Sequence, residues 1–212
     1  MTEKRLIPAS ETQIEFKVAN SRFITTAAPA FTVDQAKEFI SQVKQRYSDA
    51  SHNVPVFIIG HGASTTEHSS DAGEPGGTAG RPALAVLRGS GLGDIAVVIT
   101  RYFGGTKLGT GGLVKAYSDS VREVLAALPK AQKVATVTTS FTLPYPLFEQ
   151  TKRLADKHKG IVSREEFGSE VTLSLQFAAA NFQDFAAQLN QLSNGKISAE
   201  IVEENLNTIM PL

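Results

Sequence analysis

The first part of the chain alternates between strand-like and helix-like spacing of its hydrophobic residues. Residues 14–18 and 22–26 alternate apolar and polar side chains, which predicts two antiparallel strands joined by a short turn. Apolar residues recur at helical spacing across 33–47, directly after a capping-box pair that is typical of a helix start. The apolar, β-branched run 54–59 predicts another strand. The opening order is therefore β-β-α-β.

A long polar segment separates this group from the next elements. Residues 60–80 are rich in glycine and show neither the helical nor the strand period, so they are predicted to form a loop. A short helix is predicted to begin at Pro82 and to end near Gly89. The apolar run 95–102 predicts a buried strand, and the apolar stripe across 113–128 predicts a helix packed against the sheet.

The pattern restarts after Pro129, and the polar residues 130–133 are predicted to be a linker. Strands and helices then alternate in the order β-α-β-β-α-β, which is the split βαβ, ferredoxin-like order. The predicted ranges are 136–143, 147–158, 161–167, 170–177, 181–192 and 197–202. Residues 205–212 are expected to be a loose end. The sequence therefore predicts an α+β protein with two domains, residues 1–133 and 134–212.

Composition restricts the chemistry. Of the 212 residues 42% are hydrophobic and 20% are charged, which is typical of a folded globular protein. The absence of cysteine excludes disulfides, zinc–thiolate sites and thiol catalysis. Neither a signal peptide nor a membrane-spanning run is recognisable, so a cytoplasmic protein is expected. Formal net charge is zero, so any nucleic-acid binding would have to depend on a local patch.

A glycine-rich segment joins the strand 95–102 to the helix that follows. Glycines at this density usually provide positive φ angles or close backbone approach. The start of the next helix would offer free amides to an anion, with Arg101 and Lys107 adding charge and Tyr102 a flat surface. No phosphate-loop fingerprint is complete, so a purely structural turn is the alternative. The glycines are Gly104, Gly105, Gly109, Gly111 and Gly112.

The polar loop holds the other candidate side chains. Asp71 and Glu74 lie among turn-forming residues and could cap the backbone of their own loop, while Thr78 shortly precedes a helix start. The sharper hypothesis is that the loops 69–82 and 101–112 meet at one end of the sheet and form one cleft. The spacing of histidine and acidic residues matches no metal motif, so no metal site is expected. No serine nucleophile pattern is present either.

Two long motifs resemble those of a known family. The stretches SSDAGEPGGTAGRP and VVITRYFGGTKLGTGGLVKAYSDSV, with SRFITTAAP and DASHN, are similar to the signature of the IMPACT/YigZ family. The second half resembles that family's bacterial C-terminal domain. One difference is local: bacterial relatives tend to carry two adjacent acidic residues where this chain has Asp71 and Ala72. The resemblance covers nearly the whole chain.

This resemblance implies a fold more strongly than an activity. It implies a first domain similar to domain 2 of ribosomal protein S5 and to domain IV of elongation factor G. The second domain would be ferredoxin-like, similar to the C-terminal domain of that factor. Eukaryotic relatives act in translational control, but they carry an additional N-terminal domain that we do not expect here. The family has no established catalytic residue.

These observations together predict a cytoplasmic binding protein that engages structured RNA, the ribosome or a translation factor through the glycine-rich cleft. The alternatives are an enzyme that binds a phosphorylated metabolite or nucleotide, with Asp71 or Glu74 as base or metal ligand, and a protein-interaction module. No cofactor, catalytic residue or membrane contact is expected, and the oligomeric state is open. The predicted ligand-binding residues are Asp71, Gly73, Glu74, Thr78, Arg101, Tyr102, Gly104, Gly105, Lys107, Gly109, Gly111 and Gly112.

Overall fold

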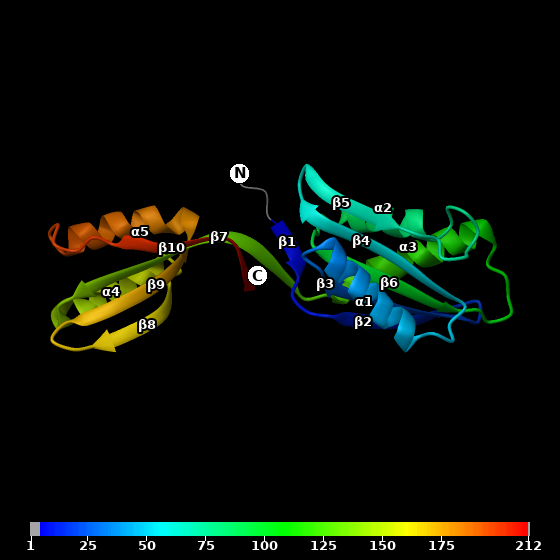
Figure 1. Cartoon of the computed structure of the whole chain (residues 1–212), viewed down its shortest axis with the longest axis horizontal. Coiled ribbons are helices and arrows are strands. Elements are labelled where there is room, and N and C mark those ends of the chain that lie inside the picture. The colour runs from blue at the N-terminus through cyan, green and yellow to red at the C-terminus, as the bar shows by residue number, and fades with distance from the viewer. Residues whose placement is uncertain (1–4, 212) are drawn as a thin grey trace. The chain divides into compact units, whose positions relative to one another are not determined.

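The computed structural model describes residues 5–211, which form two compact units divided between Gln132 and Lys133. Helices and strands are mixed throughout both units, which confirms the α+β class (Figure 1). The first unit contains β1 (Arg5–Pro8), β2 (Thr12–Val18), β3 (Ser21–Pro29), α1 (Val33–Arg46), β4 (His52–His61), β5 (Ser64–Ser69), α2 (Gly80–Gly89), β6 (Ile95–Tyr102) and α3 (Gly109–Ala127).

The first unit is built on a five-stranded antiparallel sheet in the order β2-β3-β6-β4-β5. Its central strand β6 is buried on both faces. Ile95, Val97 and Ile99 pack with α2 and α3 in one core, whereas Ala96 and Val98 pack with α1 in the other. Helices on both faces explain why β6 is a continuous apolar run rather than an alternating one.

The polar segment 60–80 differs from its prediction. Its first part is not a loop, because Ser64–Ser69 forms β5 and pairs with the end of β4. β5 is an edge strand with mostly exposed side chains, so its sequence carries no apolar alternation. The short strand β1 was missed as well. β5 is ordered by backbone pairing, which hydrophobic periodicity does not report. β1 buries Ile7 but spans only four residues, which is too short for an alternation to show.

Helix α3 begins earlier than its apolar stripe suggested. It starts at Gly109, so Gly109, Gly111 and Gly112 lie in its first turn and not in the loop before it. The apolar stripe starts only at Leu113 because the first turn projects beyond the core. The exposed segment between β6 and α3 is therefore short, residues 103–108.

The second unit contributes four strands and two helices, and its sheet counts five strands because β1 also pairs with β7. β7 (Lys130–Leu143), α4 (Tyr145–Lys157), β8 (Ile161–Phe167), β9 (Val171–Ala178), α5 (Ala179–Leu192) and β10 (Glu200–Pro211) follow one another. β7 and β8 flank β9, and β10 pairs with the other side of β7. On β9 every second residue, from Val171 to Phe177, is fully buried in the core beneath α4 and α5. The split βαβ order is present as predicted.

Two predictions about the ends of this unit were wrong. Residues 130–133 are not an irregular linker, because β7 already starts at Lys130. Most of the expected loose end belongs to β10, and residue 212 lies outside the described residues. Both segments are ordered by strand pairing, because they belong to β7 and β10, which pair with each other. Within the described residues, no helix combines the length and the hydrophobicity needed to cross a membrane.

Candidate functional site

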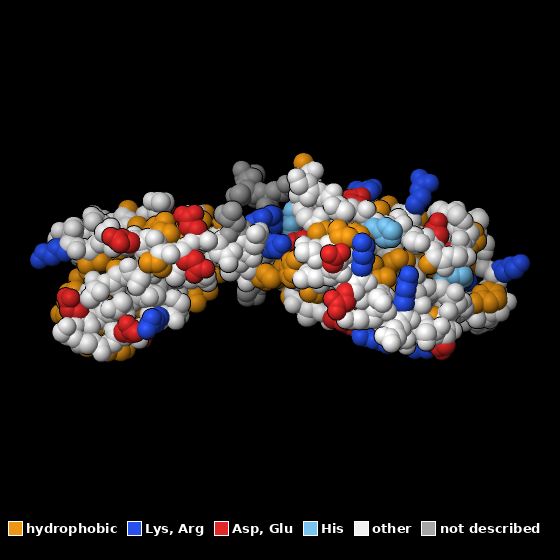
Figure 2. All heavy atoms as spheres, in the orientation of Figure 1, with side chains coloured by type: hydrophobic (Ala, Val, Ile, Leu, Met, Phe, Trp, Pro, Cys, Tyr) orange, Lys and Arg blue, Asp and Glu red, His pale blue; other side chains and the backbone are white. Residues whose placement is uncertain are grey.

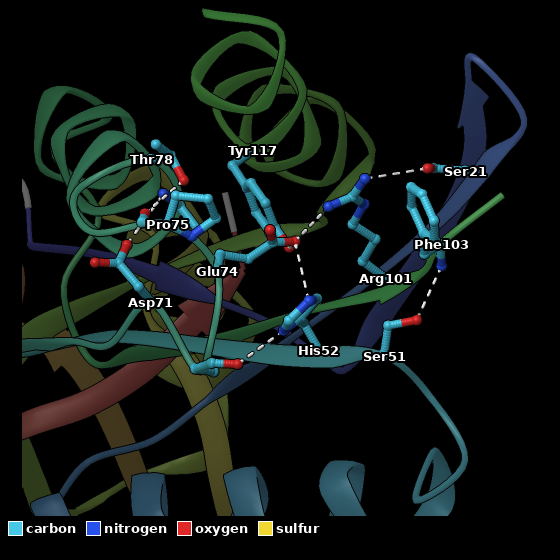
Figure 3. Close-up of polar contacts among 12 residues, drawn as sticks. Ser21, Ser51, His52, Asp71, Glu74, Pro75, Thr78, Arg101, Phe103 and Tyr117 are labelled. Atoms are coloured by element: carbon cyan, nitrogen blue, oxygen red, sulfur yellow. Dashed lines mark hydrogen bonds and ion pairs between the residues drawn. The ribbon is translucent and has the colours of Figure 1, made fainter. Parts of the chain in front are cut away.

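A buried charge network joins the loop before α2 to the end of β6. Glu74 Oε1 accepts hydrogen bonds from Arg101 Nη1 and from the Tyr117 hydroxyl, both at 2.7 Å (Figure 3). Glu74, Arg101 and Tyr117 are only 8%, 4% and 0% exposed. Burial, with the hydrogen bond to Glu74, raises the pKa of Tyr117 far above its ordinary range. The hydroxyl is therefore a permanent donor to the carboxylate.

Further contacts fix this ion pair from both sides. His52 Nδ1 lies 2.9 Å from the Ala72 carbonyl and must donate to it, which leaves His52 Nε2 at 3.8 Å from Glu74 Oε1. Arg101 Nη2 donates to Ser21 Oγ at 3.3 Å. Arg101 Nε has no hydrogen-bond partner among the described residues. The guanidinium is thus held firmly at its tip.

Asp71 organises the loop in which it lies. Its carboxylate accepts hydrogen bonds from the amides of Gly77 (2.7 Å), Ala79 (3.1 Å) and Gly80 (2.8 Å), and so caps the start of α2. Burial alone would raise the pKa of Asp71, but the three amides outweigh it and hold the pKa below its ordinary value. Thr78 contributes locally, because its hydroxyl donates to the loop's own backbone.

The two predicted loops are therefore joined, but buried side chains fill the place where they meet. Arg101 differs from the expected surface phosphate contact, because β6 directs its side chain inward towards Glu74. Gly73 lies against the His52 ring with a φ of +89°. No group of three or more potential metal ligands occurs among the described residues.

The exposed part of the region is the segment after β6. The guanidinium of Arg101 lies 5.5 Å from the centre of the Phe103 ring, and 47% of Phe103 is exposed. The amide of Phe103 donates to Ser51 Oγ at 3.0 Å (Figure 3). Lys107 is exposed a few residues further on. This segment together with the start of the first turn of α3, residues 103–111, is called the glycine loop below.

The start of α3 differs from the start of α2. Leu108 occupies the N-cap of α3 and has no oxygen to accept a hydrogen bond from the first-turn amides. In α2, by contrast, the Asp71 carboxylate accepts from the amides of the N-cap residue Ala79 and of Gly80, the first residue of the helix. The first turn of α3 therefore presents amides and a positive dipole end beside Lys107.

Tyr102 is already engaged on one side. Its hydroxyl donates to Asp49 Oδ1 at 2.7 Å, and this bond raises the pKa of Tyr102. The guanidinium of Arg22 lies 5.5 Å from the ring centre. Tyr102 therefore fastens the end of β6 to the loop after α1.

The glycines of the loop and of the first turn of α3 differ in why the fold needs a residue without a side chain. A Cβ on Gly104 would lie 2.0 Å from the Asn20 carbonyl oxygen, so no side chain fits there. Gly105 and Gly109 adopt φ values of +83° and +70°. A Cβ on Gly112 would press on the side chain of Leu108 at 3.1 Å. Gly111 has neither a positive φ nor a neighbour within 4 Å, so the fold does not require glycine there.

We expect Gly104→Ala and Gly111→Ala to have opposite effects on stability. The first should lower the free energy of unfolding by about 1–3 kcal/mol, because the new methyl group clashes with backbone. The second should leave it unchanged or raise it by up to about 1 kcal/mol, because alanine is the better helix former. Thermal unfolding of the two variants measures the difference. Equal melting temperatures would contradict the assignment of Gly104 to close packing.

Hydrophobic periodicity did not reveal the polar contacts that two residues make in the charge network. The sequence placed Tyr117 on the apolar stripe of its helix and within a family-like motif. It placed His52 in the DASHN stretch, where a metal ligand or an acid/base group was weighed against a solvated loop residue and the solvated residue was preferred. A buried tyrosine usually finds a partner for its hydroxyl, which was a usable signal for a nearby buried acceptor. Ser21 begins the family-like stretch SRFITTAAP, but no sequence pattern indicated its contact with Arg101.

Fold and site together define a two-domain α+β protein that presents an exposed glycine loop above a buried ion pair. The Impact N-terminal domain model matches residues 19–125, and the model of a domain of unknown function, DUF1949, matches residues 141–196. Each match lies within one of the two structural units.

The chain belongs to the IMPACT family. It is 37% identical to the IMPACT family member YigZ of Escherichia coli, over 95% of this chain and 100% of that one. A family member of Haemophilus influenzae is 31% identical over 93% and 97% of the two chains. A solved structure titled as an hypothetical protein has 35% identity and a TM-score of 0.62, covering 97% of this chain and 100% of its own.

Proposed function

We propose that this protein is a cytoplasmic binding protein of the translation machinery, and that the glycine loop contacts RNA phosphate. The observation that carries the proposal is the uncapped first turn of α3 beside the exposed Lys107. The resemblance of the sequence to a family whose eukaryotic members act in translational control directs the proposal towards RNA, the ribosome or a translation factor.

Different groups of the glycine loop would make different contacts with the ligand. The α3 amides and Lys107 would contact a phosphate, and the missing side chain of Gly111 would let a nucleic-acid backbone approach closely. Arg101 would not touch the ligand, since Glu74 already holds it. On the face shown in Figure 2, basic side chains of the first unit are scattered among acidic ones, which fits a local contact better than a broad basic surface.

The contacts of the two acidic residues favour binding over the enzyme alternative. A general base must reach the proton that it removes. Asp71 is engaged by three amides, and Glu74 is buried against Arg101 and Tyr117. Neither carboxylate is presented to a ligand in this arrangement.

The test is co-sedimentation with ribosomes and anisotropy titration with labelled RNA across a salt series. Lys107→Ala should weaken binding most at low salt and reduce the slope of log K against log salt by about 1. Lys37→Ala is the matched control. Lys37 is exposed on α1, which packs on the face of the sheet opposite to α3. If Lys107→Ala and Lys37→Ala bind alike at every salt concentration, the proposed contact is wrong.

A thermal-shift screen separates this proposal from the small-ligand alternative. A nucleotide present at one hundred times its Kd should stabilise the protein by about 2.7 kcal/mol. A shift of that size with a nucleotide and Mg²⁺, without binding to RNA or ribosomes, would favour the alternative.

A further inference from the structure

We propose that Phe103 is a stacking platform for an unpaired base, so that the RNA bound at the glycine loop is single-stranded where it touches the protein. The inference rests on the proposed function and specifies its ligand. It is carried by an exposed aromatic ring whose support is buried and fixed.

Contacts with Ser51 and Arg101 fix the position of Phe103. Its backbone amide is bound to Ser51 Oγ at 3.0 Å, and the guanidinium of Arg101 lies 5.5 Å from the ring centre. Arg101 cannot move freely, because Glu74 and Ser21 bind its two terminal nitrogens. A second ring, Phe23, lies 5.6 Å from the same guanidinium. The stack Phe23, Arg101, Phe103 therefore leads from the core to the surface.

An aromatic ring in this setting suits base stacking. Aromatic pairs prefer offset stacking, and a ring that is already ordered loses little conformational entropy on binding. Phe103 remains 47% exposed, although Arg101, which its ring contacts, is buried. The buried ion pair thus fixes the Phe103 ring so that one apolar face stays exposed to water. A stacked base can cover this face.

The second contact lies close along the chain. Lys107 lies four positions after Phe103, so their Cα atoms are at most about 14 Å apart. One nucleic-acid strand can therefore place a base on the ring and a phosphate at Lys107 or at the α3 amides. In a duplex, both faces of an internal base are already stacked, so a single strand is required.

Tyr102, the aromatic residue that the sequence suggested for stacking, is less suited to it. Arg22 lies 5.5 Å from its ring centre, and the hydroxyl is tied to Asp49. Both partners belong to exposed loops or strand ends, so a base would have to displace them. Phe103 requires no such displacement.

The experiment compares a short labelled single-stranded RNA with the same strand annealed to its complement. Wild-type protein should bind the single strand more tightly. Phe103→Leu keeps the residue apolar but removes the π face, and should weaken single-strand binding about 5- to 100-fold while leaving duplex binding unchanged. Phe103→Tyr should retain the affinity. Phe167→Leu, on an exposed phenylalanine of the second unit, is the matched control.

The outcomes distinguish this inference from the proposed function. If Phe103→Leu binds the single strand like wild type, with its fold intact by circular dichroism, the stacking role is wrong. If Lys107→Ala still weakens both RNA forms in that case, the proposed function stands without it. If no RNA form shows binding that depends on Lys107, both proposals fail together.

Discussion

Replacing Glu74 with alanine is expected to lower the free energy of unfolding by about 3–5 kcal/mol, because the substitution strands the buried charge of Arg101. Arg101 is 4% exposed and lies between two phenylalanine rings, so water cannot replace the lost carboxylate. The Tyr117 hydroxyl loses its acceptor at the same time. Glu74→Gln should cost less, because the amide oxygen can still accept one of these bonds.

Urea unfolding of the full chain, followed by circular dichroism because the chain has no tryptophan, measures this loss. Glu15→Ala is the matched control. Glu15 also binds an arginine through two bonds of 2.8 Å, to Arg22, but both side chains are more than 40% exposed. Solvent screens that pair, so only a small change is expected. Similar midpoints for the two variants would contradict the role assigned to the buried pair.

Replacing Asp71 with alanine is expected to cost about 2–3 kcal/mol, because three amides lose their common acceptor. Two of them, from Ala79 and Gly80, belong to the start of α2, which would fray without the carboxylate. Asp71→Asn should cost less, because one oxygen remains to accept. Thermal unfolding of both variants tests the ranking, and an alanine variant as stable as wild type would contradict it.

The same carboxylate should make stability depend on pH. Its pKa in the folded protein is lowered below the ordinary value of about 3.9, so its contribution is complete above that pH and is lost as the pH falls through the folded pKa. The difference in melting temperature between wild type and Asp71→Asn should therefore shrink below about pH 4. A difference that stays constant as the solution is acidified would show that the charge is not what the amides bind.

The hydrophobic pattern predicted the elements whose side chains are buried. α1 was predicted as 33–47 and is Val33–Arg46, and the apolar run of β6 identified the central strand. The same pattern missed β1, β5 and most of β10. Pairing with a neighbouring strand, rather than burial of an apolar face, orders β5 and β10, whereas β1 buries Ile7 but spans only four residues.

The sequence also identified the chemical groups of the candidate site but not their partners. Asp71 was correctly given a local capping role among its alternatives, because such contacts span only a few residues. Arg101 was expected at the surface because it stands beside a glycine loop. Its partners, Glu74 and Tyr117, are 27 and 16 positions away, and no local pattern reports contacts over such separations.

The sequence by itself therefore determined the fold class, the family resemblance and the elements that bury apolar side chains, because these depend on composition and on spacing along the chain. Only the tertiary structure decided that Arg101 is buried while Phe103 is exposed, although the two are separated by a single residue. The reason is physical: a strand's periodicity says which side chains share a face, whereas Glu74 and Tyr117, brought in from other elements, decide which charge can be buried there.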